Sequence, residues 1–117
     1  MEVCIVNNFI RIFPKNSWFP FVLPLKKSYF WALKFEVTEA QLKELDYYES
    51  IESRLFERSE TEIVLKNAKT TIAIIYIPSK NTIKYLNLKP ELDLNDRWKE
   101  EIKKIPELVI KFPELVL

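Results

Sequence analysis

The sequence predicts an α+β fold, and three observations lead to this prediction. Val3–Phe13 and Thr70–Ile77 are rich in apolar and β-branched residues, which favours β-strands, with Val3–Phe13 forming one or two of them. Thr38 begins a segment that carries the signals of a helix start. From Asp93 onward, apolar residues recur at spacings of three and four, which is typical of an amphipathic helix. The chain therefore combines strands with one internal and one C-terminal helix.

The remaining strands follow from alternation and from turn residues. Trp18–Leu25 contains two prolines and is interpreted as an irregular edge or extended segment. Tyr29–Val37 alternates, so its odd-numbered side chains share one face of a strand. Arg54–Leu65 is the next strand, and the strongly β-branched Thr70–Ile77 is expected to be a central one. The turn between these two strands needs a residue with positive φ, and Asn67 is expected to supply it.

The internal helix is predicted to run from Thr38 to about Tyr48. Thr38 and Gln41 fit a capping box, in which each side chain accepts a hydrogen bond from the backbone N–H of the other residue. Leu42 and Leu45 define the buried face of this helix.

The C-terminal helix is predicted to start at Asp93 or Asn95, either of which can act as its N-cap. Trp98, Ile102 and Ile105 share one face of it. The tail that follows is apolar for a chain end, so we expect it to pack on the body of the protein or on a partner.

Composition limits the class of protein. The 117 residues fit a single domain, 1–117, and a net charge of +1 gives no electrostatic reason to bind nucleic acid or an anionic membrane. A single cysteine, Cys4, excludes an internal disulfide and is typical of a reducing compartment. No segment has the pattern of a membrane helix or a signal peptide. We therefore expect a cytoplasmic protein.

Two residue types are missing from the sequence, and their absence restricts the chemistry. There is no histidine, which excludes Ser–His and Cys–His triads and histidine-based metal sites. There is no glycine, which excludes a glycine-rich phosphate loop. The bias toward Lys, Glu and Ile, with few Cys, Met and Gln, is typical of proteins from thermophiles.

Glu49 is the candidate catalytic residue. It lies seven residues after Leu42 and four after Leu45, so it continues the apolar stripe of the internal helix if the helix extends that far. Burial would raise the pKa of its carboxyl group toward neutrality, which suits a general acid or base. Asp46 is expected to lie to the side and stay solvated. The alternative is an irregular helix end from which Glu49 points into water.

Several segments resemble the γ-glutamylcyclotransferase-like family, also called avirulence-induced-gene-like. The similarity covers about residues 18 to 78, and the order and spacing of the segments carry it. Leu45-Asp46-Tyr47-Tyr48-Glu49 resembles the end of the family's helix, and Phe56-Glu57-Arg58 resembles the start of its next strand. The other similar segments are Trp18–Pro24, Trp31–Val37 and Ile74-Ile75-Tyr76-Ile77.

The resemblance implies a small, mostly antiparallel sheet that closes toward a barrel, and a reaction inside one substrate molecule. In that reaction the α-amine of a γ-glutamyl compound attacks its own γ-carbonyl group, which releases 5-oxoproline and an amine. Glu49 would act as the general acid and base, and Phe56 and Tyr76 would bind the substrate. The family's Tyr-Gly-(Ser/Thr)-Leu loop would stabilise the oxyanion through backbone N–H groups. The resemblance implies no metal and no cofactor.

The sequence departs from the family at that loop, because it contains no glycine. In one alignment Val6-Asn7-Asn8-Phe9 replaces the loop. In the other, which the spacing to Trp18 and Pro24 favours, Asn8–Ile12 matches a later strand of the family and the loop strand is absent. Ser50 also stands where family members often have glycine, and Phe56 replaces a tyrosine.

Two functions stay open from the sequence. The first is a cyclotransferase acting on a small γ-glutamyl compound. The second is a non-catalytic descendant that binds a small ligand or another protein. A nucleic-acid surface at the aromatic segment Trp18–Trp31 is disfavoured by the near-zero net charge. If the first strand of the family is missing, an exposed sheet edge would allow a homo-oligomer.

Overall fold

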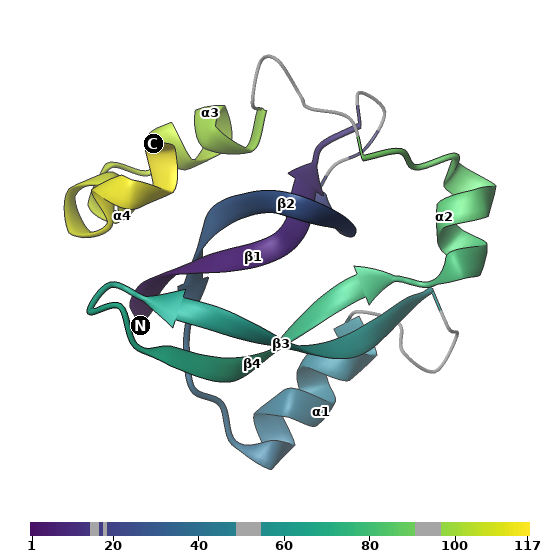
Figure 1. Cartoon of the computed structure of the whole chain (residues 1–117), viewed down its shortest axis with the longest axis horizontal. Helices are drawn as coiled ribbons and strands as arrows, with labels where there is room; N and C mark the ends of the chain where they lie inside the picture. The colour runs from purple at the N-terminus through teal and green to yellow at the C-terminus, as the bar shows by residue number, and fades with distance from the viewer. Residues whose placement is uncertain (15–16, 18, 49–54, 91–96) are drawn as a thin grey trace.

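The computed structural model describes residues 1–14, 17, 19–48, 55–90 and 97–117. Strands and helices follow one another in an α+β arrangement, as the sequence predicts (Figure 1). Its elements are β1 (Glu2–Ile12), β2 (Phe21–Lys34), α1 (Glu39–Tyr48), β3 (Phe56–Leu65), β4 (Thr70–Pro78), α2 (Lys80–Leu86), α3 (Arg97–Lys103), α4 (Pro106–Lys111) and the 3₁₀ helix η1 (Pro113–Val116).

The four described strands form one antiparallel sheet in the order β2-β1-β3-β4. β1 pairs with β2 along almost its whole length but with β3 over only three residues, Cys4 to Val6. The sheet curls, so that Cα atoms of its two end strands, β2 and β4, come within 8 Å of each other. This curl agrees with the partial closure toward a barrel that the family resemblance implies. β4 is an end strand, however, and not the central strand expected from its β-branched residues.

β2 is a single long strand where the sequence suggested an irregular segment followed by a strand. Pro24 lies within β2, opposite Phe9 of β1, and is tolerated because β2 is an end strand with one unpaired side. The irregularity is instead a register shift next to Asn8, where Asn8 and Lys27 both have positive φ, 67° and 68°. The Lys27 N–H donates to the Asn8 side-chain oxygen at 3.3 Å, which joins the two strands at this point.

The turn between β3 and β4 corrects another expectation. Ala68, not Asn67, has the positive φ, at 67°. Asn67 contributes through its side chain, whose oxygen accepts a hydrogen bond from the Lys69 N–H at 3.0 Å. This is an Asx-type turn, which uses Asn one position before the left-handed residue.

The helices confirm most of the sequence interpretation. At the start of α1, the Thr38 N–H donates to the Gln41 side chain at 2.9 Å, and the Gln41 N–H donates to the Thr38 hydroxyl at 3.2 Å, so the predicted capping box is present. α2 is a further helix that was not predicted from the sequence. Ser79 caps it by accepting from the Thr82 N–H at 3.2 Å, and Asn87 ends it with a left-handed φ of 52°.

The C-terminal helical region packs on β1 and β2 (Figure 1), which confirms the expectation for the apolar tail. It is divided into short helices, because Pro106 and Pro113 each begin a new one. Its core contains the buried residues Val3, Phe112 and Leu115, with Trp31, Leu33, Trp98, Ile102 and Leu108 packed against them. Ile105 was expected on the same face but is 46% exposed.

A charged residue also holds this region. The guanidinium of Arg11, on β1, lies 3.5 Å from the centre of the Trp98 ring of α3 and 4.9 Å from that of Phe30. Its Nη1 donates to the Trp31 carbonyl oxygen of β2 at 3.0 Å. Arg11 thus joins two strands and the first C-terminal helix by cation–π and hydrogen-bond contacts.

The packing of the tail can be tested with two leucines near the end of the chain. Leu115 is 1% exposed and Leu117 is 70% exposed. Leu115→Ala should lower the free energy of unfolding by about 2–5 kcal/mol, because it leaves a cavity in the core. Leu117→Ala, the control, should change it by less than about 0.5 kcal/mol. Urea unfolding at neutral pH measures both, and equal stability of the two variants would contradict the described packing.

Candidate functional site

Helix α1 is attached to the sheet at its C-terminal end by three polar side chains. Arg58 on β3 donates from Nε to Asp46 Oδ1 at 2.7 Å and from its Nη2 to Asp46 Oδ2. The hydroxyl of Tyr76 on β4 donates to Asp46 Oδ1 at 2.6 Å. Arg58 and Tyr76 lie directly opposite each other across the β3–β4 pair. We call these three residues the Asp46 cluster.

The Asp46 cluster changes the ionisation of its members. Hydrogen bonds from Arg58 and Tyr76 hold the pKa of Asp46 below its usual value. Burial, together with the hydrogen bond to the Asp46 carboxylate, raises the pKa of Tyr76 to about 12. Asp46 was expected to stay solvated at the side of the helix, and that expectation was wrong. Arg58 forms an ion pair with Asp46.

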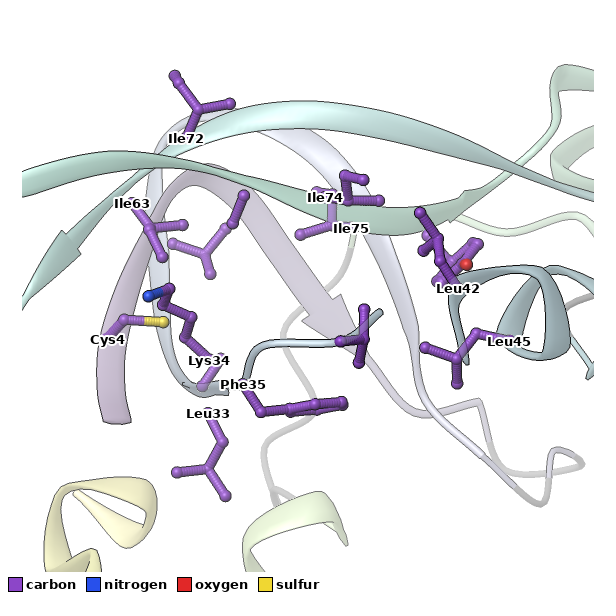
Figure 2. Close-up of a pocket in the computed structure, with 15 residues that line it drawn as sticks. Cys4, Leu33, Lys34, Phe35, Leu42, Leu45, Ile63, Ile72, Ile74 and Ile75 are labelled. Carbon is purple, nitrogen blue, oxygen red and sulfur yellow. The ribbon is translucent and has the colours of Figure 1, made fainter. Parts of the chain in front are cut away.

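A cavity of about 470 Å³ lies between α1 and the sheet (Figure 2). We call it the central cavity. Leu42 and Leu45 of α1, the predicted buried face of the helix, border one end of it, and Cys4 and Lys34 lie at the other end. The residues that line it are Cys4, Val6, Ala32, Leu33, Lys34, Phe35, Val37, Leu42, Leu45, Ile63, Ile72, Ala73, Ile74, Ile75 and Tyr76. Among these lining residues, Lys34 and Tyr76 alone carry a side-chain nitrogen or oxygen atom.

The predicted site residues are only partly brought together. Glu49 lies outside the described residues, one position beyond the end of α1 at Tyr48. Tyr76 borders the central cavity. Phe56 does not: it stacks on Phe21, with ring centres 5.9 Å apart, and borders a separate, open hollow of about 770 Å³. The Asp46 cluster lies between the two, since Asp46 and Arg58 border the same hollow as Phe56.

The sequence contains a signal for the Asp46 cluster that the sequence-based prediction missed. A hairpin whose last pair is Leu65 and Lys69 places Arg58 directly opposite Tyr76. An arginine and a tyrosine side by side on one face of a sheet provide three donors for a carboxylate on a helix packed above them. Asp46 is the carboxylate at the end of that helix.

Cys4 and the metal-binding residue types form no reactive or metal site in the described residues. Cys4 is 2% exposed, and burial raises the pKa of its thiol, which makes it unreactive. Within residues 1–14, 17, 19–48, 55–90 and 97–117, no group of three or more Asp, Glu, Cys or His side chains could hold a metal ion. The helices in this part of the chain are all too short or too polar to cross a membrane.

The geometry defines a class of protein: a small α+β protein with a curled antiparallel sheet, a helix held on it by a partly buried carboxylate, and a largely apolar cavity between them. Comparison with known proteins gives the family. The family model described as "Gamma-glutamyl cyclotransferase, AIG2-like" matches residues 3–100. The chain therefore belongs to this family, as its sequence motifs suggested.

Solved structures share the fold at low sequence identity. The solution structure of At5g39720.1 from Arabidopsis thaliana has 22% identity and a TM-score of 0.63, over 95% of this chain and 70% of that chain. That of At3g28950.1, also from Arabidopsis thaliana, has 18% identity and a TM-score of 0.66, over 97% and 67% of the two chains. A structure named "Gamma-glutamyl cyclotransferase" has 16% identity and a TM-score of 0.60, over 88% and 72%. A search of curated proteins gave no match.

Acid should weaken the attachment of α1. The pKa of Asp46 is lowered in the folded protein, so the stabilisation is complete above the ordinary aspartate pKa of about 4 and is lost as the pH falls through the folded-state value. We expect Asp46→Asn to be less stable than wild type at neutral pH, and this difference to shrink toward zero near about pH 2.

Urea unfolding of both proteins across this pH range measures the difference. Glu57→Gln serves as the control, because it removes an exposed carboxylate from the same stretch of β3. A gap between wild type and Asp46→Asn that is independent of pH would contradict the role given to the Asp46 carboxylate.

Proposed function

We propose that this protein is a γ-glutamyl cyclotransferase that releases 5-oxoproline from a γ-glutamyl amine or peptide, with Glu49 as its general acid and base. The observation that supports this most is the Asp46 cluster. It fixes the C-terminal end of α1 beside the central cavity, and Glu49 follows Asp46 by three residues in the chain. Family membership supports the same reaction class.

The proposed reaction needs proton transfer but no water. The α-amino nitrogen of the γ-glutamyl group attacks its γ-carbonyl carbon, and a new carbon–nitrogen bond closes the five-membered ring. The bond from that carbon to the leaving nitrogen then breaks. Glu49 takes a proton from the attacking nitrogen and gives it to the leaving nitrogen, so the products are 5-oxoproline and a neutral amine.

The central cavity would favour this chemistry by its lining. Apolar side chains exclude water, and a carboxyl group next to such a surface has a raised pKa. A carboxyl group that titrates nearer neutrality exchanges protons with an amine more readily than one with an ordinary pKa. Tyr76 would act at the same end of the cavity, where its hydroxyl is already engaged with Asp46.

The second candidate function is a non-catalytic module that binds a small ligand or a protein. The absence of glycine favours it, because the family's oxyanion loop depends on that residue. The scarcity of polar side chains around the central cavity favours it as well. In that case the cavity would hold an apolar ligand without converting it.

The two functions are separated by the release of 5-oxoproline from a panel of γ-glutamyl amines and peptides. We expect wild type to release it, and Glu49→Gln to lower kcat by about 100- to 10,000-fold, because the general acid and base is lost. Glu44→Gln, which alters an exposed glutamate of α1, should keep wild-type activity.

Circular dichroism should show all three proteins folded. If folded wild type releases no 5-oxoproline from any member of the panel, the enzymatic proposal fails and the binding module takes its place.

A further inference from the structure

The central cavity lies along the free edge of β4. Its lining includes five consecutive residues of this strand, Ile72–Tyr76, and four consecutive residues opposite them, Ala32–Phe35, most of them at the end of β2. Successive side chains of a strand point to opposite faces of the sheet. A cavity that contacts every residue of a strand segment therefore runs along its edge. Within the described sheet, β4 is hydrogen-bonded to β3 alone, so this edge has no paired strand, although the curl of the sheet brings part of β2 within 8 Å of β4.

The register of the β3–β4 pair shows which backbone groups face that edge. The Leu65 N–H donates to the Lys69 carbonyl oxygen at 2.8 Å, which makes these two residues a hydrogen-bonded pair. Such pairs alternate along an antiparallel ladder with pairs that are not hydrogen-bonded. Ile72 and Ile74 belong to the second kind, opposite Glu62 and Glu60. Their N–H and C=O groups consequently point away from β3, toward the central cavity.

The edge is unusually open to pairing. β4 has no charged residue and no proline before Pro78, and Ile72 and Ile74 are 60% and 42% exposed. Natural proteins protect exposed edges with charges, prolines or a covering element. An edge that has unpaired backbone groups and apolar side chains, and that borders a cavity, is suited to bind an extended peptide backbone.

The two ends of the cavity differ in their chemistry (Figure 2). Leu42 and Leu45 of α1 lie at one end, and Lys34 lies with Cys4 at the other. Tyr76 belongs to the α1 end, because its hydroxyl donates to Asp46 of that helix. The Lys34 ammonium has Glu36 at 3.9 Å, a loose pair in which the Glu36 side chain is 92% exposed. Lys34 can therefore also pair with the carboxylate of a ligand. From Ile72 to Tyr76 the edge spans about 13 Å, the length of about four extended residues.

We propose that the central cavity binds a γ-glutamyl peptide whose apolar residues lie as an added strand along Ile72–Ile74 and whose C-terminal carboxylate pairs with Lys34. The direction of the peptide rests on the proposed function, which puts the γ-glutamyl group at the α1 end. The preferred substrate is then a glutamate joined through its γ-carboxyl group to about three apolar residues. A volume of about 470 Å³ falls in the range of small-ligand sites.

Other occupants satisfy fewer of these groups. An alkylamine would fill the apolar space but would form no hydrogen bonds with the backbone groups of Ile72 and Ile74. A long strand from a second copy of this chain would meet α1, because the Asp46 cluster holds that helix across the Tyr76 end. A short peptide satisfies the edge and fits between α1 and Lys34.

Binding is measured first, by calorimetry on the full-length Glu49→Gln protein, so that no peptide is converted. The probe is γ-Glu-Val-Val-Val with a free C-terminus. Methylation of two of its backbone nitrogens should weaken binding about tenfold or more, because hydrogen bonds to the edge are lost. Amidation of the peptide's C-terminus should lower its affinity for the Glu49→Gln protein. In the double variant Glu49→Gln/Lys34→Gln, amidation should leave the affinity unchanged. Lys26→Gln, which alters an exposed lysine of β2 outside the cavity, is the control for Lys34→Gln.

The outcomes separate this inference from the proposed function. Equal affinity for the methylated peptide, or no binding at all, overturns the inference. The inference also fails if light scattering shows a concentration-dependent dimer and the Ile72 and Ile74 amides are protected from hydrogen exchange with no peptide bound. In that case a second copy of this chain covers the edge. The expected binding pattern without 5-oxoproline release from wild type supports the peptide site and refutes the enzyme. Release from γ-glutamyl butylamine and the peptide with equal kcat/KM refutes the peptide site and supports the enzyme.

Discussion

The contact of one carboxylate with two strands fixes how α1 lies on the sheet. Asp46, near the end of α1, accepts hydrogen bonds from Arg58 of β3 and Tyr76 of β4. Without them, the helix would be held by Leu42 and Leu45, which border a cavity and not a filled core. The position of α1 and the shape of the central cavity depend on this contact. A bidentate arginine is suited to such a role because its planar geometry fixes orientation as well as distance.

The protein adopts positive φ angles without glycine. Where the backbone needs positive φ, it uses Asn8, Lys27, Ala68 and Asn87. Non-glycine residues in this region cost free energy, about 1–2 kcal/mol each, so each of these positions needs local support. Asn8 and Asn67 provide it through side-chain hydrogen bonds to backbone N–H groups of the same turn or bulge. Residues other than glycine have fewer accessible conformations in the unfolded chain, so these turns lose less conformational entropy on folding than glycine turns would.

Local signals were sufficient for the parts of the fold that depend on local contacts. The capping box of α1 could be predicted because Thr38 and Gln41 interact across a single turn. The extent of β2 could not, because Pro24 is tolerated only in an end strand, and sheet order is not a local property. The same limit explains β4: its β-branched residues favour a strand but do not say how many neighbours it has. In the candidate site, the sequence indicated the wall formed by Leu42 and Leu45. The role of Asp46 was missed, because it becomes visible only when the β3–β4 register places residues 12 and 30 positions away side by side.

Helix α1 and the C-terminal helical region are attached to the sheet by contacts of different chemical nature. Arg11 holds the C-terminal region through aromatic rings and a carbonyl oxygen, and an arginine keeps its charge at any pH at which the protein is folded. One ion pair there, Lys66 with Glu114, is sensitive to acid, but the surrounding apolar cluster is not. α1 depends on a carboxylate. Acid strong enough to protonate Asp46, below the ordinary aspartate pKa of about 4, would therefore loosen α1 from the cavity while the C-terminal region stays attached, so the two sides of the sheet would come apart at different pH.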